Sequence, residues 1–331
     1  MATANRRVWI VLLIALALAA PAVAYPVFLM KAMCFALFAC ALNLLLGYTG
    51  LLSLGHAAFF GSAAYLTGYS VKAWGLPTEV GILAGTALGA ALGLIFGLLA
   101  IRRKGIYFSM ITLALAQMVY FYQLGARYTG GEDGMQSIPR GKLLGLVSLS
   151  NDLTMYYFVL AVFVFGFFVV YRTIHSPFGH VLRAIRENEP RAISLGYEVR
   201  LYKLLAFVLS AALSGLAGST KALVFQLASL TDVHWNTSGE VVLMTLVGGI
   251  GTMVGPAVGA FFLVTMDHYL AGFGEWVQVM QGAIFVATVM AFRRGIVGEM
   301  MARYRLRRLA IAAKSPVFDR IADPKAGHGP G

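Results

Sequence analysis

The side chains that could do chemistry are concentrated in one charged segment, residues 173–203. The segment carries two His, four Arg, one Lys and three Glu, and apolar runs too long for soluble helices flank it on both sides. Membrane-embedded chemistry would need paired carboxylates, a nucleophile beside a base, or a metal cluster, and the apolar runs show none of these patterns. A polar island between two membrane spans instead favours contact with a soluble partner.

The segment also carries signals for two short helices. Ser176 suits an N-cap and Pro177 suits the first helical position. Pro190 cannot continue that helix but can start another, and Gly196 is a natural stop. We therefore expect a helix, a break, a short helix and a stop. Four apolar side chains recur at helical spacing and form one stripe: Phe178, Val181, Leu182 and Ile185. The stripe could fit a groove on a soluble partner, or the segment could be an ordinary solvated loop.

Composition indicates what surrounds this segment. Of the 331 residues, 59% are hydrophobic and only 12% are charged, whereas soluble domains carry about 25% charged residues. The net charge of +12 does not indicate nucleic-acid binding, because the basic residues lie mainly at the ends of apolar runs. The fold class we expect is all-α: a polytopic integral membrane protein of about 8–10 transmembrane helices, some of them short or broken.

The expected membrane elements follow from runs of about 20 apolar residues. The last part of the chain is interrupted by glycines and a proline, which predicts two short elements in place of one span. The first run also resembles a signal peptide, and we favour an uncleaved span. The ten elements cover residues 8–25, 27–47, 57–74, 80–101, 106–124, 155–171, 204–223, 240–252, 253–270 and 276–292.

Basic residues predict the orientation. The triplet at residues 102–104 and the Arg-rich C-terminal end are expected in the cytoplasm together with both termini. The loops at 125–153 and 224–239 show no such bias and are expected outside. We therefore expect a membrane domain over residues 1–297, with the charged loop 173–203 inside it, and a basic cytoplasmic tail over residues 298–331.

Cysteine usage adds no chemistry. Cys34 and Cys40 lie in one apolar run, where free cysteine behaves as a small buried hydrophobe. Six residues apart on one helix, they suit neither a disulfide nor a metal site. We expect no metal and no cofactor bound by this chain.

Four stretches together resemble a known family. They are the charged loop from residue 177 to 203, the sequence GYTGLLSLGHAAFFG at 47–61, the TGG and DG of residues 129–134, and the glycine-rich 248–260. In their order along the chain, these four stretches are similar to the branched-chain amino acid permeases of ABC importers, and more to the LivM-type subunit than to its partner. The domain at 1–297 would then be the permease domain.

The resemblance implies a transport subunit that is not an enzyme. It implies a second, LivH-type permease subunit, two cytoplasmic ATPases and an external solute-binding protein as partners, in a bacterial cytoplasmic (inner) membrane. ATP hydrolysis by the ATPases would drive alternating access, and no nucleic acid would be involved. The loop residues that would couple to the ATPases are Ile185, Arg186, Glu187, Asn188, Glu189, Ala192 and Gly196.

Other polar residues carry two interpretations each. Glu132 and Asp133 could dock the binding protein or form a solvated turn. The broken stretch at 248–255 could open a cavity at mid-membrane or permit close packing between subunits. Uncharged or weakly basic side chains in or beside the spans could line a solute pathway, or they could satisfy backbone groups at bends or form hydrogen bonds between helices. These are Asn43, Thr49, Ser53, His56, Thr112 and Gln117.

Alternative functions remain open at this point. Related permeases carry urea, amides or other small solutes, and the sequence does not name the solute. A secondary transporter would work without an ATPase, so changes at Arg186 or Glu187 and addition of vanadate would leave its transport unchanged. A membrane-embedded enzyme is disfavoured because the spans lack catalytic patterns.

Overall fold

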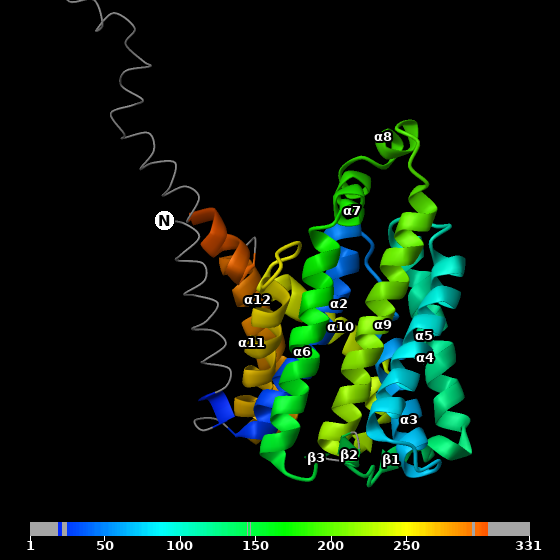
Figure 1. Cartoon of the computed structure of the whole chain (residues 1–331). Helices are drawn as coiled ribbons and strands as arrows, with labels where there is room; N and C mark the ends of the chain where they lie inside the picture. Colours follow the sequence, from blue (N-terminus) through cyan, green and yellow to red (C-terminus); the bar gives the residue numbers. More distant parts are fainter. Residues whose placement is uncertain (1–18, 22–24, 144, 146, 293–294, 304–331) are drawn as a thin grey trace, which may run out of the picture.

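The computed structural model describes residues 19–21, 25–143, 145, 147–292 and 295–303. The predicted first span at 8–25 therefore lies almost wholly outside the described residues, and so does most of the predicted tail at 298–331. The described chain is a bundle of helices running roughly side by side (Figure 1), as the all-α prediction required.

The helices of the bundle, long and short, correspond to the elements predicted from residue 27 onward. In the described part of the chain, six segments are long and apolar enough to cross a membrane. The helices of the bundle are α2 (Pro26–Thr49), α3 (His56–Lys72), α4 (Thr78–Ala100), α5 (Ile106–Gly125), α6 (Asp152–Ile174), α9 (Val199–Phe225), α10 (Trp235–Gly248), α11 (Gly255–Leu270) and α12 (Val277–Ala291).

Helix α2 is the centre of the bundle. It packs against α9, α11 and α6, while α3 and α4 pack on α9 from the other side (Figure 1). Its most apolar 18-residue stretch is 83% buried, against 28% for those of α5 and α6. Helices α5 and α6 therefore present most of their apolar surface outward, toward lipid or another membrane subunit.

The two ends of the bundle differ in structure. At one end lie α7 (Pro177–Glu187) and α8 (Glu189–Ser194), and at the other lie four short strands (Figure 1). Strand β1 (Met135–Gln136) pairs antiparallel with β4 (Leu227–Ala228), and β2 (Lys142–Leu143) pairs with β3 (Val147–Ser148). The two loops predicted to share one side of the membrane thus meet directly at the end opposite α8.

Several predicted boundaries were wrong by a few residues. Helix α9 begins at Val199 and not at 204, α6 continues to Ile174, and α10 begins at Trp235 and not at 240. Hydropathy marks the limits of the hydrocarbon layer, whereas a helix can continue into the aqueous zone with charged side chains. At 27 residues, α9 is about 40 Å long, enough to project beyond the bilayer and carry the α7–α8 loop.

Two glycine contacts account for the close helix packing. A Cβ at Gly218 of α9 would overlap the carbonyl of Phe60 on α3, so these helices meet backbone to backbone. A Cβ at Gly248 would likewise overlap the carbonyl of Gly255, where α10 turns into α11. Gly248 and Gly255 therefore pack closely within the chain, while a mid-membrane cavity and packing between subunits both stay predictions for residues 248–255.

Candidate functional site: the α7–α8 loop and its junction with the bundle

The charged loop has the predicted helix–break–helix–stop shape. The Ser176 hydroxyl accepts a hydrogen bond from the Gly179 amide at 3.4 Å, which caps α7. The Asn188 side chain accepts one from the Arg191 amide at 3.1 Å and starts α8. Gly196 has a φ of +86°, a left-handed conformation that favours glycine and ends the second helix.

The stripe at residues 178–185 packs partly against the chain itself, where the sequence left open whether it packs there or enters a partner's groove. Leu182 and Ile185 are 0% and 3% exposed. Ile185 packs with Ala192 of α8 and Val199 of α9 in a small core of the loop. These buried contacts hold the two short helices together and against α9. Ile185 and Ala192 are therefore scaffold residues, and a charge at either would disrupt the loop itself.

The surface left for a partner lies on α8 and the turn after it. Ile193, Leu195 and Tyr197 are 55%, 67% and 40% exposed, and we call these three residues the α8 patch. Glu187 and Gly196, which the sequence predicts to couple to the ATPases, are also exposed. The sequence could not separate the buried Ile185 from the exposed Ile193, because helical spacing does not show which face packs on α9.

Glu189 fastens the loop to two other parts of the chain. One carboxylate oxygen lies 3.1 Å from Lys104 Nζ and the other lies 3.1 Å from Lys203 Nζ. Partial burial alone would raise the pKa of Glu189, but hydrogen bonds and charge from Lys104 and Lys203 hold that pKa below its usual value. The basic triplet at 102–104 and the charged loop thus lie on the same side, as the orientation rule predicted.

Arg186 connects α7 to the bundle at the end of α2. Its guanidinium donates a hydrogen bond to the Gly47 carbonyl, and its aliphatic stem packs beside Gly50. Asn43, one turn earlier on α2, donates to the Thr252 carbonyl at 2.8 Å and accepts from the Gly251 amide at 2.9 Å. The charged loop, the first glycine-rich stretch and the second therefore meet at one point.

The residues proposed to line a solute pathway are mostly engaged within the chain. His56 and Ser210 share a 2.8 Å hydrogen bond, and Ser210 also donates to the Ala41 carbonyl. Thr112 accepts from the Leu54 amide at 3.2 Å and donates to a carbonyl of its own helix.

Two of the remaining pathway candidates also form hydrogen bonds within the chain. Thr49 donates to the Leu45 carbonyl, and Ser53 accepts from the Gly55 amide. Gln117 is only half-buried on α5. With Asn43, five of the six therefore satisfy backbone or side-chain groups at bends and junctions; solute contact by them stays a prediction. The sequence had no signal for Ser210, which lies in an ordinary apolar helix.

Glu132 and Asp133 lie at the opposite end of the bundle from α8. They belong to the short helix η2 (Gly131–Asp133), and both are exposed. Docking of a binding protein at this turn stays a prediction. Among the described residues, no group of three or more His, Cys, Asp or Glu side chains could hold a metal ion.

A bundle of apolar helices, with the charged α7–α8 loop held at one end by Glu189 and Arg186, is the structure of a multi-pass membrane protein. The model of the family described as "Branched-chain amino acid transport system / permease component" matches residues 26–289. The chain belongs to this family. It is thus a transport permease subunit of a multi-subunit system and not an enzyme.

Three relatives illustrate the range of the family. The permease protein LivM of the high-affinity branched-chain amino acid transport system of Escherichia coli is 27% identical over 289 residues, covering 80% of this chain and 68% of the relative. The autoinducer 2 import system permease protein LsrC of Klebsiella pneumoniae is 27% identical, covering 62% and 60%. A probable branched-chain amino acid permease LivH of Methanocaldococcus jannaschii is 24% identical, covering 74% and 81%. No solved structure matches this chain.

Proposed function

We propose that this chain is the LivM-type permease of an ATP-driven importer for branched-chain amino acids in a bacterial inner membrane. Its partners would be a LivH-type permease, two cytoplasmic ATPases and an external binding protein. The family match and the relatives named for branched-chain amino acids support the solute class. The urea, amide and other small-solute alternatives are separated by uptake assays that compare leucine with these solutes.

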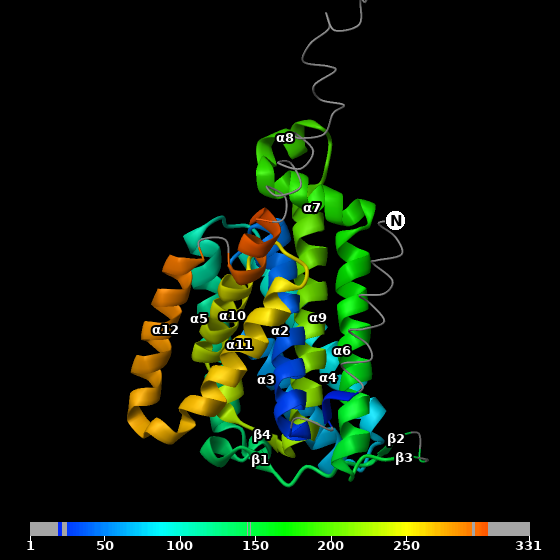
Figure 2. The same ribbon diagram turned by 90° about the vertical axis from the view of Figure 1, so that its left-hand side faces the viewer.

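The α7–α8 loop is the observation that carries the mechanism. It projects from one end of the bundle (Figure 2), has an exposed apolar patch, and is fastened to the transmembrane helices by Glu189 and Arg186. An ATPase that holds the α8 patch could therefore pull on α2 and α9 when it binds nucleotide. The switch between outward-facing and inward-facing states would follow from that movement.

Co-purification of the ATPase tests this proposal. Ile193→Asp should reduce recovery of the ATPase with the permease about ten-fold or more, because a charge replaces an exposed apolar contact. The matched control is Val147→Asp, since Val147 is 46% exposed at the opposite end of the bundle. Full recovery and full leucine uptake with Ile193→Asp would contradict the proposed docking. Vanadate-insensitive uptake would favour the secondary transporter.

A further inference from the structure

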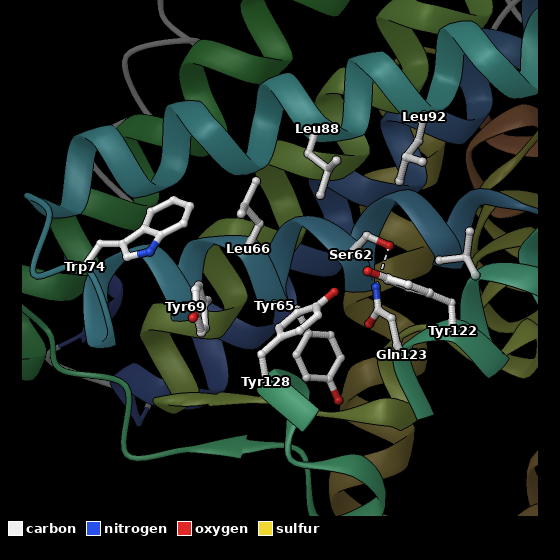
Figure 3. A pocket seen from close by; sticks show the side chains of 11 residues that line it. Ser62, Tyr65, Leu66, Tyr69, Trp74, Leu88, Leu92, Tyr122, Gln123 and Tyr128 are labelled. Atoms are coloured by element: carbon white, nitrogen blue, oxygen red, sulfur yellow. Dashed lines mark hydrogen bonds between the residues drawn. The ribbon is translucent and has the colours of Figure 1, made fainter. Parts of the chain in front are cut away.

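A second site lies at the end of the bundle opposite α8. Helices α3, α4 and α5 border an open cavity of about 430 Å³, a size typical of small-molecule sites. It is drawn in Figure 3, with side chains from all three helices and from the loop that follows α5 converging on it. None of the residues proposed from sequence to line a pathway lines this cavity.

The cavity wall contains two buried polar atoms without a partner. Tyr65 and Gln123 are 1% and 4% exposed. The Gln123 amide nitrogen donates to the Ser62 hydroxyl at 2.7 Å, which leaves Gln123 Oε1 free to accept a hydrogen bond. The hydroxyl of Tyr65 is buried and has no hydrogen-bond partner either. Buried polar groups are nearly always paired, so two unpaired ones beside one cavity point to a ligand that pairs them.

Aromatic rings form the rim of the cavity. The Tyr69 ring lies 5.4 Å from that of Trp74 and 5.5 Å from that of Tyr128, and Tyr128 lies 6.5 Å from Tyr122. Such rings alone could be an ordinary aromatic belt at the membrane surface. A belt does not explain why Tyr65 and Gln123 are buried and unpaired beneath it.

The lining restricts the chemistry of the occupant. The residues around the cavity include leucines such as Leu66, Leu88 and Leu92 but no charged side chain. A ligand must therefore be small, carry an apolar body, and supply a donor to Gln123 Oε1 and a partner to the Tyr65 hydroxyl. An ammonium group also suits tyrosine faces. A lipid chain would leave both polar atoms unpaired, and a fully polar solute such as urea would leave the leucines uncovered.

We infer that this cavity is a binding site for the transported solute on the side opposite the ATPases, and that it takes a zwitterionic amino acid with an apolar side chain. The inference rests on the proposed function and deepens it. The solute would enter here after release from a binding protein, before the bundle switches.

Photolabelling of the assembled transporter tests the site. A diazirine analogue of L-leucine should label peptides from residues 62–74 and 119–128, and excess L-leucine should compete. Tyr65→Phe removes only the hydroxyl, so we expect leucine binding to weaken about five-fold while the melting temperature of the empty protein stays level or rises. A purely structural role for the hydroxyl would lower the melting temperature and leave leucine binding unchanged. Tyr120→Phe is the matched control, since Tyr120 lies on α5 but does not line the cavity.

The outcomes separate this inference from the proposed function. Labelling confined to other peptides, uncompeted occupancy by detergent or lipid, or unchanged leucine binding by Tyr65→Phe would overturn the cavity assignment. If the complex still assembled with its ATPases and hydrolysed ATP in those cases, the proposed function would stand. Failure of assembly would count against the proposed function instead.

Discussion

Arg186 on α7 donates a hydrogen bond to the main-chain carbonyl of Gly47, 139 residues earlier in the chain. Gly47 lies in the last turn of α2, the most buried of the six candidate membrane spans in the described residues. Arg186 therefore links α7 to the end of α2, beside a second contact in which the Arg183 guanidinium lies 5.3 Å from the centroid of the Tyr48 ring. The same point contacts the α10–α11 turn, because Asn43 bonds both Gly251 and Thr252.

Replacing Arg186 should uncouple ATP hydrolysis from transport. We expect Arg186→Ala to lower the solute moved per ATP about ten-fold while the ATPase still docks, because a charge-assisted hydrogen bond is worth about 1.5–3 kcal/mol. Reconstituted vesicles that report leucine uptake and phosphate release together give this ratio. Arg172→Ala is the control, since Arg172 is an exposed arginine at the end of α6. An unchanged ratio in Arg186→Ala would show that the contact does not transmit movement.

Glu189 should stabilise the loop in a pH-dependent way. Its neighbours Lys104 and Lys203 hold its pKa below the usual value, despite burial that acts in the opposite direction. A carboxylate with a depressed folded-state pKa contributes stability that is present above the unfolded-state pKa of about 4.3 and is lost as pH falls through the folded value. We therefore expect the loop to resist protease near neutral pH and to become cleavable below about pH 4.

Glu189→Gln should remove this effect at neutral pH. The variant leaves the Lys203 ammonium, whose side chain is only 8% exposed, without its carboxylate. The loss should be about 2 kcal/mol and should appear as faster proteolysis of residues 173–203. Glu187→Gln is a matched control two residues away, because the Glu187 side chain is exposed. Equal proteolysis of the two variants would mean that the Lys104–Glu189–Lys203 contacts add no stability.

The sequence predicted the helical elements well because each has a simple physical signal. Long apolar runs predicted the spans, and Ser176 and Gly196 predicted where the two helices of the loop begin and end. The basic triplet at 102–104 predicted the side of the membrane on which the loop lies. Burial within the loop had no such signal. Ile185 and Ile193 are the same residue type in adjacent helices, and only the packing on α9 makes one core and the other surface.

The polar residues inside the bundle were harder to interpret for a related reason. A buried Thr or Ser in a membrane helix can bond its own backbone, another helix or a solute, and its sequence neighbours do not decide among these. Thr112 and His56 proved to bond other parts of the chain. The cavity around Tyr65 and Gln123 was missed because its walls come from three separate helices and a loop. The sequence does not predict that these elements lie next to one another.

Gly218 should be intolerant of any side chain. Its Cβ would overlap the Phe60 carbonyl, and backbone cannot move aside as a flexible side chain can. Gly218→Ala should therefore separate α3 from α9 and cost about 1–3 kcal/mol of stability, measured as a lower melting temperature in detergent. Gly282→Ala on α12 is the control, because nothing lies within 4 Å of its Cβ position. Because alanine has a higher helix propensity than glycine, Gly282→Ala should leave the stability of the protein unchanged or raise it by up to about 1 kcal/mol. Equal melting temperatures for the two variants would contradict backbone contact at Gly218.

Glu132 and Asp133 should attract a positively charged surface of the binding protein. Both carboxylates are exposed on η2, beside the β1–β4 pairing and at the same end as the cavity. Replacing both by Lys should reverse the local charge and slow association about ten-fold at low salt, with a smaller effect at high salt, because exposed charges steer encounter and are screened by ions. The measurement is binding-protein stimulation of ATP hydrolysis in vesicles at two ionic strengths. The control is the double substitution E132D with D133E, which exchanges the two acidic side chains, keeps the charge and should leave stimulation unchanged. A double-lysine variant with normal, salt-independent stimulation would assign these residues to a solvated turn.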